Sequence, residues 1–128
     1  MRSLIDTHAL LWWLRNDPRL SPRANAVLTD PASDLLFSVA GAWEIAIKCA
    51  LGQLQLSIDP ATYVTTQLQI NGIEPLVIEL NHALAVYSLP LHHKDPFDRL
   101  LIAQAMVEHL PIITADPQIA RYGVEIIW

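Results

Sequence analysis

The stretch HKDPFDRLLIAQA, from His93 to Ala105, decides the fold of this chain. Asp95-Pro96 is a typical helix start, because aspartate caps the N-terminus of a helix and proline fits its first turn. The apolar residues that follow predict a long helix over about 95–109. This helix carries one further acid, Asp98, at its start and beside an apolar face.

Strand-like and helix-like segments alternate away from this helix. The expected strands are residues 3–5, 35–39, part of 74–80, 112–114 and 124–127. The other expected helices are residues 7–14, a helix opened by Ser21-Pro22, 42–51, one opened by Asp59-Pro60, and a short one from Asn81 to about Leu89. Short apolar strands without alternation are typical of a parallel sheet covered on both faces. We therefore expect one domain over residues 1–128 with an α/β fold, a three-layer α/β/α sandwich around a central, mainly parallel sheet of about five strands.

The composition excludes several classes of protein. The chain has 128 residues, 52% of them hydrophobic, which makes disorder unexpected. No apolar run reaches the roughly 18–20 residues that span a bilayer, and no signal-peptide pattern opens the chain, so we expect a cytoplasmic protein without membrane contact. Cys49 is the single cysteine, which excludes an internal disulfide. The net charge of -5 argues against a general nucleic-acid coating protein and is compatible with a basic partner.

Four acids are candidates for chemistry: Asp6, Glu44, Asp98 and Asp116. Each also has an ordinary explanation. Asp6 and Asp116 follow strands and are candidate helix caps, and Asp98 is a candidate for a capping-box-like start. Glu44 stands four residues before Lys48, the favourable order for an ion pair on a helix surface.

The surroundings of these acids favour chemistry over capping. Asp6 and Asp116 come after strands, and binding sites in parallel sheets form beyond the carboxyl ends of strands. Glu44 and Asp98 have apolar neighbours, where unpaired carboxylates repel each other and resist ionisation. A divalent cation removes this conflict. Oxygen ligands without cysteine favour Mg²⁺ or Mn²⁺ over Zn²⁺.

The four contexts, taken in order, resemble the four acidic motifs of the PIN domain family, and within it those of VapC-type toxins. The motifs are LIDTHA (4–9), SVAGAWEIAIK (38–48), HKDPFDRLLIAQA (93–105) and ITADP (113–117). The resemblance covers essentially the whole chain, and the second and third motifs together are specific. Gly41 is one departure, because similar sequences often carry a small hydroxyl residue there.

The resemblance implies a metal-dependent endoribonuclease that acts as the toxin of a toxin–antitoxin pair. Asp6, Glu44 and Asp98 would be the principal carboxylates, with Asp116 as a fourth ligand or an outer group. Thr7 and Thr114 would be supporting hydroxyls. One or two Mg²⁺ (or Mn²⁺) ions would activate water against an RNA phosphodiester.

The resemblance also implies binding partners. Lys48, Lys94 and Arg99 lie in the motif segments and are candidates to bind RNA phosphates, with His92 and His93 assisting. Such toxins resemble known homodimers that hold an antitoxin segment, and a basic antitoxin residue suits an acidic pocket. Trp12 and Trp13 give one helix more apolar surface than a single face normally buries, so they are candidates for core packing or for an interface.

Three other interpretations are weaker. A receiver domain needs adjacent acids after its first strand and a lysine after a late strand, and this chain has neither. A PIN-like module that only binds RNA or protein does not require all four acids. A structure-specific DNA nuclease is usually longer.

Overall fold

The computed structural model describes residues 2–128 and shows a five-stranded sheet in the order β3-β2-β1-β4-β5. The strands are β1 (Arg2–Ile5), β2 (Asp34–Ser38), β3 (Glu74–Leu76), β4 (Ile112–Ile113) and β5 (Ile126–Ile127). All four strand pairs are parallel. This confirms the expected parallel sheet.

Helices connect the strands, as parallel pairing requires. They are α1 (Thr7–Leu14), α2 (Pro22–Thr29), α3 (Val39–Ala50), α4 (Pro60–Ile70), α5 (Leu80–Ala85), the 3-10 helix η1 (Val86–Ser88), α6 (Pro96–Glu108) and α7 (Pro117–Ala120). The residues predicted to open α2, α4 and α6 do cap them. Ser21, Asp59 and Asp95 each accept a hydrogen bond from a backbone N–H in the first turn, and proline follows each of them.

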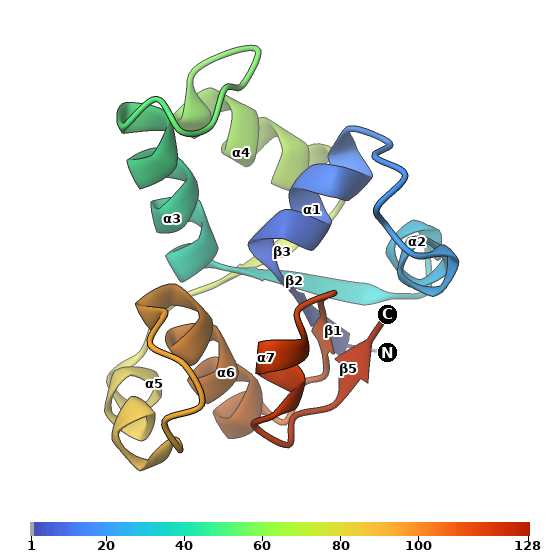
Figure 1. The fold of residues 1–128 in the computed structure, drawn as a ribbon. Coiled ribbons are helices and arrows are strands. Elements are labelled where there is room, and N and C mark those ends of the chain that lie inside the picture. Colours follow the sequence, from blue (N-terminus) through green and yellow to red (C-terminus); the bar gives the residue numbers. More distant parts are fainter. Residues whose placement is uncertain (1) are drawn as a thin grey trace.

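The side chains of adjacent residues in a strand point to opposite faces of the sheet. Ile5 and Phe37 pack with the buried side chains of α1 to α4, whereas Leu4 and Leu36 pack with those of α6 and α7. Figure 1 shows the two helical layers, with α1, α3 and α4 on one side of the sheet and α5, α6 and α7 on the other. The three-layer α/β/α sandwich is therefore confirmed.

The strand register places the carboxyl ends of β1, β2 and β4 side by side at one edge of the sheet. Ile5 of β1 is paired with Phe37 of β2 and with Ile113 of β4. Because these strands are parallel, the residues that follow them emerge side by side. Asp6 and Thr114 are two of these residues, and they come from opposite ends of the sequence.

Two helix starts differ from the prediction. Helix α3 begins at Val39 and not at residue 42, because the Ser38 hydroxyl accepts a hydrogen bond from the Ala40 N–H and starts the helix directly at the strand end. The cap of α5 is Glu79 and not Asn81. There the Glu79 N–H donates to Nδ1 of the buried His82 in a capping box.

The two tryptophans of α1 are both half-buried. Trp13 packs against the core on the α1 side of the sheet. Trp12 has its ring centroid 5.9 Å from that of Trp128 and lines a surface groove. Within residues 2–128, every helix is too short or too polar to traverse a bilayer.

Replacement of Ser3 by alanine is expected to stabilise the protein. The Ser3 hydroxyl is fully buried and has no hydrogen-bond partner among the described residues. Removing an unpaired buried hydroxyl raises the free energy of unfolding, here by about 1 kcal/mol. Urea unfolding measures this. Ser38→Ala is the matched control and is expected to lower stability, because its hydroxyl is bonded to Gln104 and Ala40. A loss of stability in Ser3→Ala contradicts the prediction.

Candidate active site

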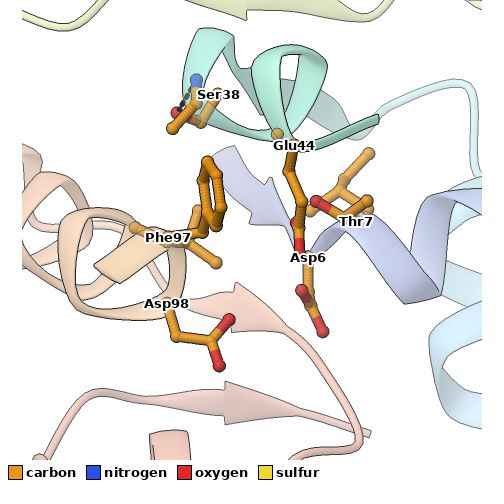
Figure 2. A pocket seen from close by; sticks show the side chains of 10 residues that line it. Asp6, Thr7, Ser38, Glu44, Phe97 and Asp98 are labelled. Atoms are coloured by element: carbon orange, nitrogen blue, oxygen red, sulfur yellow. Dashed lines mark hydrogen bonds between the residues drawn. The ribbon is translucent and has the colours of Figure 1, made fainter. Parts of the chain in front are cut away.

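A small pocket lies at the carboxyl edge of the sheet, where the first turns of α1, α3 and α6 meet. It has a volume of about 10 Å³, and three of the four candidate acids, Asp6, Glu44 and Asp98, line it. Figure 2 shows Glu44 reaching toward Asp6, with Asp98 on the facing side. A space of this size holds roughly one water molecule or a small ion.

Asp6 occupies the position before α1 but does not cap that helix with its side chain. Its Oδ2 instead accepts a hydrogen bond of 2.9 Å from the Thr114 hydroxyl. Burial raises the pKa of Asp6, and the charge of Glu44 raises it further, while the bond from Thr114 opposes both. The bond from Thr114 holds this carboxylate in place, and the charge of His8 also lowers its pKa, but burial outweighs both.

Asp98 lies in the first turn of α6, where the capping role belongs to Asp95. The Asp95 Oδ1 accepts bonds from the backbone N–H groups of Phe97 and Asp98. Burial raises the pKa of Asp98 to about 7, and the charges of Asp95, Asp6 and Asp116 add to the effect. The carboxyl group therefore does not cap the helix, and the bond from His93 only partly opposes the rise of its pKa, which a bound cation would reverse.

A chain of polar contacts leads from Asp98 into the protein. His93 Nε2 lies 3.3 Å from Asp98 Oδ2, and His93 Nδ1 lies 2.6 Å from the Tyr122 hydroxyl. The same hydroxyl accepts a bond of 3.1 Å from the Arg99 guanidinium. Sequence reasoning missed Tyr122 as a site residue, because its contacts lie 23 and 29 positions away.

Arg99, which we expected to bind RNA phosphate, has its guanidinium engaged inside the protein. It is buried, and its guanidinium donates to the carbonyl oxygens of Pro90, Val86 and Leu89 as well as to Tyr122. These acceptors belong to the segment between α5 and α6. The arginine therefore ties this segment to α6 and has its donors engaged there.

Replacement of Arg99 by lysine tests this structural role. Lysine keeps the charge but cannot reproduce the planar fork that reaches several carbonyl groups. We expect the free energy of unfolding to fall by about 1–3 kcal/mol because buried acceptors lose their donors. Chemical denaturation measures it. Unchanged stability together with weakened RNA binding would return Arg99 to the substrate site.

Glu44 is buried on α3 and forms the predicted ion pair with Lys48. The Lys48 Nζ lies 2.9 Å from Glu44 Oε2. Glu44 also lines the pocket, so the pairing and the pocket position coexist. Lys48 is therefore a neighbour of the site, as the sequence suggested.

Asp116 does not line the pocket and has a capping role. Its Oδ1 accepts a bond from the Gln118 N–H at the start of α7, and its own N–H donates to the Thr114 hydroxyl. Its charge still acts on Asp98. Thr7 lines the pocket, and Lys94 is exposed in the loop before α6.

The residues fit a divalent cation in their chemistry, although they do not form a complete shell. Within residues 2–128, no three acidic, histidine or cysteine side chains are close enough to act together as a preformed ligand group. Separate partners hold the carboxylates apart: Thr114 for Asp6, Lys48 for Glu44 and the α7 backbone for Asp116. Mg²⁺ commonly binds through one or two carboxylates, with water and substrate phosphate completing its octahedron. An oxygen-only pocket with raised carboxyl pKa values suits that mode.

Two further pocket residues had no role in the sequence prediction. Phe97 and Ser38 both line the pocket, on α6 and at the end of β2. The Phe97 ring lies 5.3 Å, between centroids, from the exposed ring of Trp43. Their signal in the sequence is only their position beside Asp98 and Glu44.

Comparison with known proteins identifies the class first. Residues 3–125 match the PIN domain family, so this chain belongs to that family. Among individual proteins, it resembles ribonuclease VapC16 of Mycobacterium tuberculosis (strain ATCC 25618 / H37Rv), with 36% identity over 69 residues. The match covers 51% of this chain and 49% of that relative, so it spans about half of each.

Solved structures share the whole fold at low sequence identity. VapBC2 from Rickettsia felis, bound to a DNA fragment from its promoter, has a TM-score of 0.72 at 11% identity, covering 98% of this chain and 97% of the other. VapBC-1 from nontypeable Haemophilus influenzae has a TM-score of 0.65 at 17% identity, covering 98% and 96%. FitAcB from Neisseria gonorrhoeae has a TM-score of 0.65 at 18% identity and the same coverage. The resemblance to PIN domains is confirmed.

Proposed function

We propose that this protein is a metal-dependent endoribonuclease that acts as the toxin of a toxin–antitoxin pair. The observation that carries the proposal is the pocket lined by Asp6, Glu44 and Asp98 at the carboxyl edge of a PIN-domain sheet. The matched relative is named a ribonuclease. Mg²⁺ or Mn²⁺ is the cofactor that fits these oxygen donors.

Asp6, Glu44 and Asp98 would hold the cation, and Asp116 would add negative charge from outside the pocket. When bound, such an ion activates water and stabilises charge on the phosphate. The chain's own groups fix the carboxylates: the Thr114 hydroxyl donates to Asp6, and His93 approaches Asp98. Lys48 offsets the charge of Glu44. Lys94, exposed in the loop before α6, is proposed to contact RNA phosphate.

An antitoxin partner is proposed on two grounds. Solved structures of the same fold include VapBC complexes. The pocket concentrates carboxylates in a chain of net charge -5, so a basic segment of the antitoxin would bind there favourably.

A homodimer is also proposed. Several exposed apolar side chains lie between β3 and α6: Val77, Leu80, Leu84, Tyr87 and Leu91. Tyr87 is 93% exposed. Apolar patches of this kind mark association surfaces in soluble proteins. The cytoplasmic location expected from the sequence stays a prediction.

The second candidate is a PIN-like module that binds RNA or protein without cleaving it. The observation in its favour is the lack of a preformed three-ligand group among residues 2–128. The raised pKa of Asp98 argues against it, because an idle site has no reason to keep strained carboxylates. Mn²⁺ binding to the purified protein separates the two, since the inactive module need not bind the ion.

Induction of this chain in a bacterial host tests the nuclease proposal. We expect the wild type to arrest growth and Asp98→Asn, matched for expression, to grow normally, because the variant loses one carboxylate of the metal site. RNA-end sequencing then identifies the cleaved target. Arrest by both forms would show that toxicity does not depend on this site. If neither arrests growth, absence of Mn²⁺ binding refutes the proposal.

A further inference from the structure

A second groove adjoins the acidic pocket. It lies between α1 and the start of the α3–α4 connection and has a volume of about 350 Å³. Thr7 lines both the groove and the pocket, so the two are adjacent at the first turn of α1. A volume of this size is in the range of sites for small organic ligands, including a nucleotide.

The charge of the groove is opposite to that of the pocket. Arg15, Arg19 and Lys48 line it, which is three of the eight lysines and arginines in the chain, and His8 lines it as well. None of its lining residues is acidic. In a protein of net charge -5, this concentration of cations beside a carboxylate site points to a phosphate-bearing ligand.

The Arg19 guanidinium stands over the Trp12 ring in this groove and is held there by Asp17. The Arg19 guanidinium lies 4.8 Å from the centre of the Trp12 ring. Its Nε and Nη2 both donate to the Asp17 carboxylate, at 3.1 and 2.7 Å, and this lowers the pKa of Asp17 to about 2. A guanidinium held along one edge presents its plane, and such planes and aromatic rings stack on nucleobases.

Arg15 and Lys48 supply the charge. Arg15 donates one bond from Nη2 to the Gln55 carbonyl, at 3.0 Å, which holds the side chain across the groove and leaves its other N–H groups available. Lys48 pairs with Glu44 of the acidic pocket and lines the groove, so it stands between the two. A phosphate beside Lys48 is therefore adjacent to the proposed cleavage site.

We propose that this groove binds the nucleotide next to the cleaved phosphodiester of a single-stranded RNA. Its base stacks on the Arg19–Trp12 surface, and its phosphate contacts Arg15 and Lys48. The inference rests on the proposed ribonuclease function and adds to it the path of the substrate. It assigns the groove to RNA and not to a protein partner, because Arg15, Arg19 and Lys48 line it without an acidic lining residue. Arg19 and Lys48 each have a carboxylate partner, Asp17 and Glu44, whereas Arg15 donates only to a backbone carbonyl and is the cation with most donors left for a polyanion.

Fluorescence anisotropy with a labelled random-sequence RNA 12-mer tests this in EDTA, where a metal-dependent enzyme does not cut. The test variant is Arg15→Gln/Arg19→Gln, and the control is Arg2→Gln/Arg23→Gln. The control removes the same charge at exposed arginines on β1 and α2. We expect the groove variant to bind about 10-fold more weakly. Loss of one phosphate contact reduces the slope of the logarithm of the binding constant against the logarithm of the salt concentration by about 0.7. Arg15→Lys/Arg19→Lys is expected to keep the salt dependence.

Equal affinities of the groove and control variants would overturn the inference. If the groove variant instead loses a co-purifying protein while RNA affinity is unchanged, the groove belongs to that protein. Failure of the wild type to bind the RNA pool also overturns the inference. The growth assay with Asp98→Asn then decides independently whether the nuclease proposal stands.

Discussion

Asp98→Asn is expected to make the metal-free protein more stable at pH 8 while it removes activity. The pKa of Asp98 is about 7 in the folded protein, against an ordinary value of 3.8. Above pH 7 the carboxylate is charged in both states, and the folded state bears the full penalty of burial and repulsion. With allowance for solvent screening, we expect the neutral amide to raise the free energy of unfolding by about 2 kcal/mol.

The stability gained by Asp98→Asn is expected to decrease as the pH falls. As the pH falls from 7 toward 4, the folded wild type takes up the proton and its penalty fades. The difference between wild type and variant is therefore large at pH 8 and small near pH 4. Thermal unfolding in EDTA at both pH values measures it, with Asp34→Asn, an exposed acid at the opposite edge of the sheet, as the control.

Addition of Mn²⁺ is expected to make the wild type more stable than Asp98→Asn, the reverse of their order in EDTA. If the ion binds at the proposed site, it raises the melting temperature of the wild type, whereas Asp98→Asn is expected to respond weakly because one proposed ligand is gone. A variant that is less stable than wild type in EDTA at pH 8 would mean that Asp98 has a structural partner that outweighs the repulsion.

Gly41→Ser is expected to cost about 2–3 kcal/mol of stability and to distort the pocket. A Cβ atom at this position would lie 2.6 Å from Cζ of Phe37 and 3.0 Å from the Thr7 hydroxyl. The Phe37 ring is 1% exposed and has no space into which to move. Overpacking of this kind outweighs the roughly 0.5 kcal/mol that serine gains over glycine in a helix.

A compensating substitution distinguishes crowding from loss of flexibility. Phe37→Leu removes the clashing ring atoms. The double variant Gly41→Ser/Phe37→Leu is therefore expected to lose less free energy of unfolding than the two single variants lose together. Ala46→Ser, at an exposed position of the same helix, is the control for serine alone. Denaturant unfolding of the four proteins measures the coupling. Additive effects would contradict the crowding argument.

The parallel sheet, and the position of the acidic residues near one edge of it, could be predicted from the sequence. Residues after parallel strands emerge at a common edge, so Asp6 could be placed from the strand before it. Asp98 was placed by the Asp95-Pro96 helix start, which also left Asp95 as the true cap. These inferences use only local patterns and the topology that they imply.

Contacts between distant segments could not be predicted in the same way. Arg99 looks like a phosphate ligand from its place beside Asp98, but its direction is set by carbonyl groups up to 13 residues earlier. The crowding at Gly41 depends on how closely α3 approaches β2 and α1. In the sequence, Arg15 and Arg19 are ordinary polar residues that follow a helix. Only the fold brings them to the groove that Lys48 also lines.

The bond from Thr114 to Asp6 joins residues 108 positions apart. The central strand β1 is made first, but its neighbour β4 is among the last elements of the domain to be synthesised. While the ribosome still encloses residues 112–114, Asp6 lacks this support and the edge of the sheet is open. The proposed ribonuclease would in this way be held inactive during its own translation and become competent only once the nascent chain can close the sheet.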